Sequence, residues 1–170
     1  MTSQTQASQT RASQTRAEHR IVVGVDGSPS GREALKWAIR QAELTGASVE
    51  AVIAWHYPVM AAGYGWAPVS AMEDTDFAGI AEKVLAAEVA DTVDPASGVR
   101  LTTAVREGNA AEVILDAADG ADLLVLGSRG HGGFAGALLG SVSQHCVHHA
   151  PCPVVIIRAP AHDHLRRASQ

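Results

Sequence analysis

The sequence predicts an α/β fold in which five parallel strands form one open, doubly wound sheet with helices on both faces. Short apolar runs alternate with helical patterns through residues 20–158, in the order βαβαβαβαβ. Such alternation is typical of a parallel sheet that is covered on both sides. A length of 170 residues suggests a single domain, and a hydrophobic content of 46% can bury a substantial core.

The first half of the predicted domain begins with an apolar, β-branched run at residues 21–25, which indicates a buried strand. Ser28 as N-cap and Pro29 as the first helical residue then begin a helix, which Gly46 ends. Residues 49–55 form the second strand. One face of the helix has apolar residues at helical spacing and is expected to face the core: Ala34, Leu35, Ala38, Ile39 and Ala42.

The second half continues the alternation. Apolar spacing predicts a helix that begins near Phe77 and stops at Asp94-Pro95. Asn109, with Glu112 three residues later, caps a short helix that runs through about Ala118. The remaining strands are expected at residues 99–105, 123–126 and 154–157, and the last helix at residues 141–149.

Ligands of open parallel sheets bind beyond the carboxyl ends of the strands, where the strand order reverses. In the strand order 3-2-1-4-5, the first and fourth strands are neighbours at this reversal. Asp26 and Gly127 each follow one of these two strands directly. We therefore expect both residues to lie at the same crevice.

Two polar segments flank the predicted domain at residues 20–158. Residues 1–19 contain Ala-Ser-Gln-Thr-Arg twice and are predicted to be a disordered tail, with a transit peptide as the weaker alternative. Residues 159–170 are predicted to form a flexible tail. Inside the domain, residues 56–73 form a long loop with several aromatic residues, and loops of this length are often functional.

Charge, hydropathy and cysteine content limit the classes of partner. The formal net charge is −5 and the isoelectric point is about 5.9, which argues against a broad nucleic-acid-binding face. No run of about 18 apolar residues indicates a membrane span. Cys146 and Cys152 match no metal-binding spacing, and we interpret them as reduced, buried thiols of a cytoplasmic protein.

The strongest functional signal is a glycine-rich stretch between the fourth strand and the last helix. Residues 127–140 contain six glycines in fourteen positions. Ser141, followed three residues later by Gln144, matches a capping box and predicts a helix start at Ser141. Glycines let backbone N–H groups approach an anion, and a helix N-terminus adds donors and partial positive charge. The pattern predicts a phosphate cradle, with a plain tight connection as the alternative.

Two other nucleotide-binding motifs fit this stretch poorly. Residues 130–135 match G-x-G-x-x-A, but they follow the fourth strand and lack the acidic residue that a dinucleotide site has about 20 positions later. No GxxxxGK[ST] sequence occurs, so the chain has no P-loop and no lysine placed on the β- and γ-phosphates.

Several motifs in register resemble one known family. Gly127, Gly130, Gly140 and Ser141 fit the pattern G-x2-G-x9-G-[ST]. Asp26-Gly27-Ser28 follows the first strand, residues 105–110 read Val-Arg-Glu-Gly-Asn-Ala, and residues 150–155 read Ala-Pro-Cys-Pro-Val-Val. Over residues 20–158 the chain resembles the universal stress protein family, and the glycine motif is characteristic of its ATP-binding branch.

The resemblance implies a set of contacts to ATP. Asp26 should bind the ribose hydroxyls, Ala54 should contact adenine through its backbone, and Gly127 should lie by the ribose. The phosphates should be held by Gly130, Gly140, Ser141, Val142 and Ser143. Mg²⁺ is expected with the triphosphate, held mainly by phosphate oxygens and water. The resemblance also implies a homodimer that forms by pairing of the last strand, at residues 154–157.

Some of the candidate residues also have a purely structural interpretation. Asp26 could cap the first turn of the helix that follows it. Arg129 could screen phosphate charge or be a solvated loop residue, and for His131 the solvated interpretation is favoured. The aromatic residues of the long loop could cover the base or pack at a dimer surface.

Four residues near the C-terminus of the last predicted helix raise the question of a metal site: His145, Cys146, His148 and His149. His145 and His149 are four positions apart, but no Glu lies between them as in HExxH. Histidines are also favoured in the last turn by the helix dipole. The sequence therefore predicts no metal ligand, and it predicts no catalytic residue.

Three functions are compatible with these observations. The favoured one is a cytoplasmic stress-response protein that retains ATP and acts through nucleotide-dependent interactions with a signalling partner of unknown identity. An enzyme that uses the same pocket, as a slow ATPase or a phosphoryl or nucleotidyl transferase, is the alternative. It is less favoured because the sequence shows no P-loop lysine, kinase motif or paired carboxylates around the loop. The third is an interaction protein with a vestigial loop.

Overall fold

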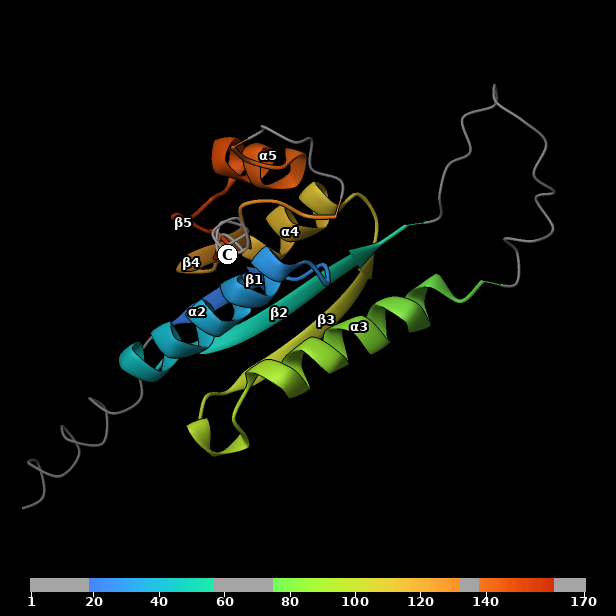
Figure 1. The fold of residues 1–170 in the computed structure, drawn as a ribbon. Helices are drawn as coiled ribbons and strands as arrows, with labels where there is room; N and C mark the ends of the chain where they lie inside the picture. The colour runs from blue at the N-terminus through green and yellow to red at the C-terminus, as the bar shows by residue number, and fades with distance from the viewer. Residues whose placement is uncertain (1–18, 57–74, 132–137, 161–170) are drawn as a thin grey trace, which may run out of the picture.

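The computed structural model of the protein describes residues 19–56, 75–131 and 138–160 (Figure 1). The predicted tails lie almost entirely outside these ranges, as does the aromatic loop beyond His56. The strands are β1 (Arg20–Gly24), β2 (Ser48–Trp55), β3 (Leu101–Glu107), β4 (Leu123–Gly127) and β5 (Val154–Ile157). The helices are α2 (Pro29–Thr45), α3 (Phe77–Thr92), α4 (Ala110–Ala118) and α5 (Ser141–His149), with one 3₁₀ turn, η2 (Pro95–Ser97).

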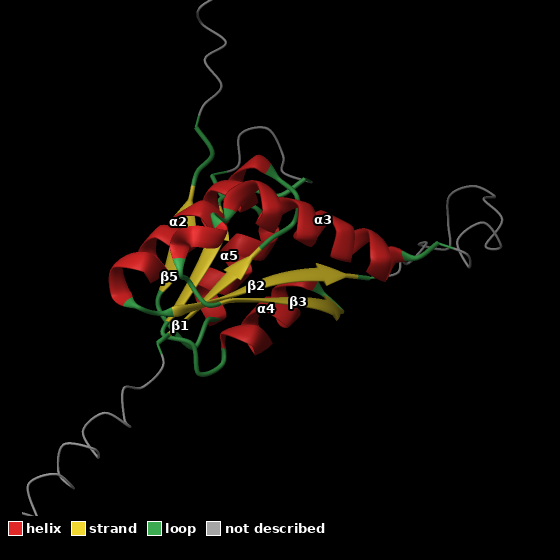
Figure 2. Ribbon diagram, turned by 90° about the horizontal axis from the view of Figure 1, so that it is seen from below, coloured by secondary structure: helices red, strands yellow, loops and turns green. Residues whose placement is uncertain are grey.

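All five strands form one parallel sheet in the order β3-β2-β1-β4-β5, which confirms the predicted fold. β1 is the central strand, and its Val22 is in register with Glu50 of β2 and Leu124 of β4. α2 and α3 pack on one face of the sheet, and α4 and α5 pack on the other. Figure 2 shows α2 and α3 on the opposite side of the strands from α4.

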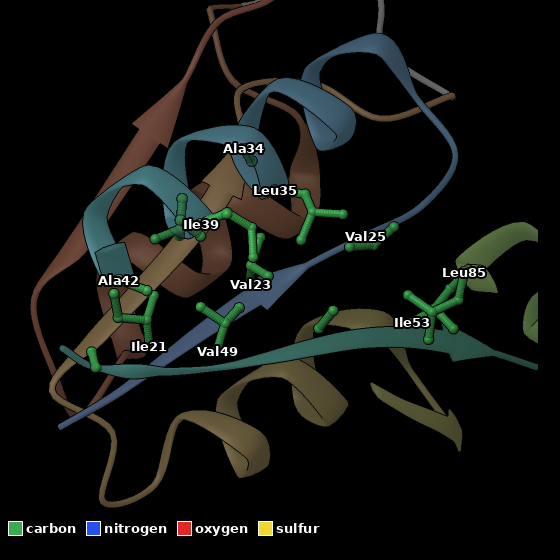
Figure 3. Packing of buried hydrophobic residues seen from close by; sticks show 14 of the residues in the cluster. Ile21, Val23, Val25, Ala34, Leu35, Ile39, Ala42, Val49, Ile53 and Leu85 are labelled. Atoms are coloured by element: carbon green, nitrogen blue, oxygen red, sulfur yellow. The ribbon is translucent and has the colours of Figure 1, made fainter. Parts of the chain in front are cut away.

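The core lies on both faces of the central strands. Because side chains alternate along a strand, Ile21 and Val23 of β1 pack under α2 (Figure 3), whereas Val22 joins the cluster under α4. Val22 and Val23 are both fully buried. The face of α2 that was predicted from apolar spacing is buried in full: Ala34, Leu35, Ala38, Ile39 and Ala42.

The predicted helix boundaries at Ser28, Gly46 and Asn109 are confirmed. The Ser28 side chain accepts a hydrogen bond from the Gly31 N–H at 3.0 Å. Gly46 ends α2 in the left-handed region, with a φ of 74°, which favours glycine. The Asn109 side chain accepts from the Ala111 N–H at 2.9 Å and begins α4.

The capping box predicted for α5 is wrong. Its N-cap is Gly140, not Ser141, and no side chain caps the helix. The reason is tertiary: the Gly140 N–H donates to the Ser128 carbonyl at 2.8 Å, while the Gly140 carbonyl accepts from the Gln144 N–H at 2.9 Å. The loop backbone therefore fixes where the helix begins, and Ser141 becomes its first helical residue.

Other predicted boundaries shift by a residue or two. β3 begins at Leu101, because a turn through Gly98 in the left-handed region precedes it, and its ladder with β2 continues to the Trp55–Glu107 pair. His19, placed in the predicted tail, already accepts a backbone hydrogen bond from Ser48 at 2.8 Å. Cys146 is buried as expected, whereas Cys152 is only half-buried.

One charged residue is buried in the helical layer. Glu88 of α3 is 3% exposed, and neither of its carboxylate oxygens has a hydrogen-bond partner. Its nearest cation is the half-exposed Arg32 of α2, with 3.7 Å between Nη2 and Oε1. Burial raises the pKa of Glu88; Arg32 and His131 lower it in part, and Asp26 adds to the rise.

We expect Glu88→Gln to raise the free energy of unfolding at neutral pH by about 1 kcal/mol, because it removes a buried charge and leaves Arg32 in solvent. A raised pKa means that the folded state binds the proton more tightly. The protonated Glu88 of the wild type therefore contributes stability below the ordinary glutamate pKa of about 4.5. This contribution is lost as pH rises through the pKa that Glu88 has in the folded state. Urea titrations from acid to neutral pH measure both effects.

The exposed Glu82 on the same helix supplies the control, because it is not among the charges that shift the pKa of Glu88. Glu82→Gln should change stability by less than about 0.5 kcal/mol. A Glu88→Gln protein that is less stable than wild type at neutral pH would show instead that the ion pair with Arg32 is net stabilising.

Candidate functional site

A cavity of about 430 Å³ opens at the carboxyl ends of β1, β2 and β4. β1 has β2 on one side and β4 on the other, so this is the point where the strand order reverses. All eight residues predicted for the site line the cavity: Asp26, Ala54, Gly127, Gly130, Gly140, Ser141, Val142 and Ser143. The structure thus brings together residues from three separate parts of the sequence.

Asp26 is held in a narrow space between two glycines. Its Oδ1 accepts a hydrogen bond from the Ser28 N–H at 3.0 Å, while the residue itself remains exposed. A Cβ atom on Gly31 would lie 2.6 Å from Oδ1, and one on Gly130 would lie 2.5 Å from Oδ2. The carboxylate can therefore keep this position only while both neighbours lack a side chain. It does brace the turn before α2, so its structural and functional interpretations are compatible.

Gly127 allows the end of β4 to approach the first turn of α2. A Cβ on Gly127 would lie 2.7 Å from the Gly31 nitrogen, from the Ser30 carbonyl carbon and from Ser30 Oγ. Two of these atoms belong to backbone and cannot move aside without shifting the helix. The glycine is thus required by packing, whatever it contributes to a ligand.

The loop after β4 is tied to the same turn of α2. The hydroxyls of Ser28 and Ser30, both buried, donate to the Arg129 carbonyl. The Arg129 N–H in turn reaches Ser30 Oγ at 3.4 Å. These bonds fix the Arg129 backbone and leave its side chain exposed on the cavity wall.

The N-terminus of α5 forms the opposite wall. Ser143 is buried and its hydroxyl donates to the Gly127 carbonyl at 2.6 Å, so it ties α5 to the end of β4. The Gly140 N–H is likewise used by Ser128. The N–H groups of Ser141, Val142 and Ser143 lie in the first turn of the helix, where no carbonyl one turn earlier can accept from them. They are the backbone donors that a ligand can use.

Arginine and histidine side chains outnumber carboxylates on the described part of the cavity wall. Asp26 is the single carboxylate there, and Arg129, His131 and His56 also line the cavity. His131 lies over Gly27, where an added Cβ would be 3.2 Å from its Nε2 and 3.2 Å from Val84 of α3. The wall formed by Ala54, Ile114 and Leu126 is apolar. Such a site can hold an anion at one end and a flat apolar group at the other.

Two features of this site were missed in the sequence. Gly31 is needed to accommodate Asp26. The only sequence signal for this role was the glycine itself, which stands in the first turn of a helix although glycine has a low helix propensity. The anchoring of Arg129 by Ser28 and Ser30 had no sequence signal, because it joins residues about a hundred positions apart. Within the described ranges, no group of three or more His, Cys, Asp or Glu side chains is arranged to hold a metal ion.

Comparison with known proteins agrees with this geometry. The model of the Universal stress protein family matches residues 18–158. The chain belongs to this family. A universal stress protein of Mycobacterium tuberculosis is 37% identical over 151 residues, which cover 81% of this chain and 47% of that protein. The chain spans about half the length of the curated relatives it matches.

Solved universal stress proteins share the fold. The protein UspA from Lactobacillus plantarum is 27% identical, with a TM-score of 0.58, over 83% of this chain and 98% of that one. A universal stress protein solved in complex with cAMP is 26% identical, with a TM-score of 0.54, over 85% of this chain and 99% of that one. No helix within the described ranges is long and apolar enough to cross a membrane.

We expect Gly127→Ala to lower the free energy of unfolding by about 2 kcal/mol, because its methyl group would overlap backbone atoms of α2. Gly140→Ala is the matched control, since an added Cβ there would be no closer than 3.4 Å to its neighbours. It should cost less than about 1 kcal/mol, as expected for exchanging glycine at an N-cap. Urea unfolding of both variants measures the difference, and equal losses would contradict the assigned packing.

Proposed function

We propose that this protein binds and retains ATP in the cavity between β1, β4 and α5, and that it acts through interactions that depend on the bound nucleotide. The observation that carries the proposal is the placement of Asp26. Its carboxylate fits between Gly31 and Gly130 because neither has a side chain. It faces the same cavity as the N–H groups of the first turn of α5, which have no acceptor within the helix. A sugar-binding acceptor and an anion-binding helix end thus share one site.

The roles of the lining residues follow from their chemistry. Asp26 accepts hydrogen bonds from the ribose hydroxyls, with Gly127 beside the ribose. Adenine lies against Ala54, close to its backbone. Gly130, Gly140 and the first turn of α5, formed by Ser141, Val142 and Ser143, surround the phosphates. The cavity volume of about 430 Å³ lies in the range of small-ligand sites.

Mg²⁺ fits this site only as a companion of the triphosphate. Asp26 is the single carboxylate on the described wall, and its Oδ1 is already bonded to the Ser28 N–H. The described part of the wall therefore offers no set of oxygen ligands for a dedicated magnesium site. Phosphate oxygens and water would supply most of the coordination.

Binding is favoured over turnover because the described wall has no free carboxylate to act as a base or to position water. Phosphoryl transfer needs cations aimed at the transferring group and a base or water-positioning residue near it. Arg129 and His131 could supply charge, but no second carboxylate lines the described wall. Slow ATP hydrolysis, or phosphoryl or nucleotidyl transfer, is the competing function for the same pocket.

The solved relative in complex with cAMP supports an adenine nucleotide as the ligand class. It also makes a cyclic nucleotide the most informative competitor in a binding experiment. A cyclic monophosphate carries one phosphate group and less charge than ATP. It would therefore gain less from the amides of α5 and from Arg129.

The edge strand β5 and the two free cysteines bear on assembly and location. β5 is an edge strand, paired on one side with β4, and all four of its residues are partly exposed. It can pair with β5 of a second copy, so we propose a homodimer. Cys146 and Cys152 are free thiols, which suits a cytoplasmic protein. A signalling partner would then read the nucleotide-bound state.

We expect the purified protein to release about one adenine nucleotide per chain on denaturation, and the emptied protein to bind labelled ATP without forming product. Stoichiometric ATP with no product supports the binding function. Many turnovers of product would favour the enzyme. Absence of nucleotide together with no ATP-induced rise in melting temperature would exclude both.

Asp26→Ala and Gly140→Ala should each weaken ATP binding at least about tenfold, which corresponds to about 1.4 kcal/mol. The first removes the ribose acceptor, and the second places a methyl group beside Gly130 in the cradle. Both variants should remain folded. Asp116→Ala, at an exposed position of α4 outside the cavity, should bind ATP as wild type does. Unchanged affinity in the first two variants would show that the pocket is wrongly assigned.

A further inference from the structure

The C-terminal half of α5 carries two exposed histidines that lie against each other. His145 and His149 are four residues apart and therefore share one face of the helix. Their ring centroids are 4.4 Å apart and the ring planes are tilted by 40°. Both residues are exposed. The sequence spacing predicted no metal ligand here and explained the histidines by the helix dipole, whereas the structure places the two rings together.

The separation of these rings matches two imidazoles on one metal ion. A ring nitrogen binds a divalent transition metal at about 2.1 Å, and the ring centre lies about 1.1 Å further out. Two rings at adjacent corners of an octahedron or square then have centroids about 4.5 Å apart, and at tetrahedral corners about 5.2 Å apart. The observed 4.4 Å agrees with the right-angled arrangement.

The surroundings suit a cation. His149 is in the last turn of α5, where the carbonyl end of the helix dipole favours positive charge, and His145 lies one turn earlier. α5 contains no acidic residue that would compete for the imidazoles. Cys146 lies between the histidines in sequence but is fully buried in the core under α4. Its thiol is therefore out of reach of an ion bound at the exposed histidines.

We propose that His145 and His149 form a two-ligand surface site for a divalent transition-metal ion of the Zn²⁺, Ni²⁺ or Cu²⁺ class, with water in the remaining positions. Imidazole is the ligand that these ions share. The pair lies at the opposite end of α5 from Ser141 to Ser143, so the site is separate from the nucleotide cavity. A bound ion bridges the last two turns of this nine-residue helix and stabilises it.

His148 provides a matched control. It is an exposed histidine in the same turn, and its ring is 6.4 Å from that of His149. It is adjacent to His149 in sequence, so the two side chains point in directions about 100° apart around the helix. Removal of His148 therefore leaves the proposed pair intact while it lowers the number of histidines by the same amount.

The test is calorimetric titration of the full chain with Ni²⁺ and with Zn²⁺, after removal of nucleotide and chelators. The chain has eight histidines, so the comparison among variants is the readout. Wild type and His148→Gln should bind one ion with the same affinity. His145→Gln and His149→Gln should each bind at least about tenfold more weakly, because the second imidazole no longer binds intramolecularly. The affinity lost in the double variant should be smaller than the product of the two single fold-losses, because the two ligands act as one chelating pair.

Equal affinity in all five proteins, or an equal loss in His148→Gln, would overturn the proposal. A second measurement needs no variant. Substoichiometric Cu²⁺ should broaden the ring resonances of His145 and His149 in the wild-type spectrum before those of the other histidines. Simultaneous broadening of all histidines would show that the ions bind without a preferred site.

Discussion

The close contact between the end of β4 and the first turn of α2 is the constraint on which the rest of the site depends. Gly127 lies directly against the backbone of Ser30 and Gly31, with no room for a side chain. This approach brings the Arg129 carbonyl within reach of the Ser28 and Ser30 hydroxyls. A single packing contact thus sets where the glycine loop leaves the sheet and how it faces the cavity.

The same turn of α2 also sets the position of Asp26. Gly31 and Gly130 approach the carboxylate from α2 and from the loop, so both segments must be in place before the acid is held. Buried Glu88 adds its charge to that of Asp26 from the neighbouring α3. The molecule therefore tolerates a buried carboxyl that accepts no hydrogen bond. Strongly perturbed ionisable groups of this kind are concentrated at functional sites.

The two ends of α5 differ in their chemistry. Its first turn presents backbone N–H groups to the cavity, and its C-terminal half presents the imidazoles of His145 and His149 to solvent. A helix of nine residues is marginal in isolation. Its position comes from the buried Cys146, which packs in the cluster under α4, and from the Ser143 hydroxyl, which is bonded to the Gly127 carbonyl. Both ends are thus oriented by contacts with the sheet.

The sequence by itself determined the α/β fold, the strand order, most helix boundaries and the family, because alternating apolar runs, caps such as Ser28 and Asn109, and the glycine motif are all local patterns. Through the family resemblance it also named eight of the residues that line the cavity. Only the tertiary structure decided that Gly140 and not Ser141 caps α5, that Gly31 makes room for Asp26, and that two exposed histidines touch. These features depend on how elements distant in the chain approach each other and on side-chain rotamers, which no local pattern specifies.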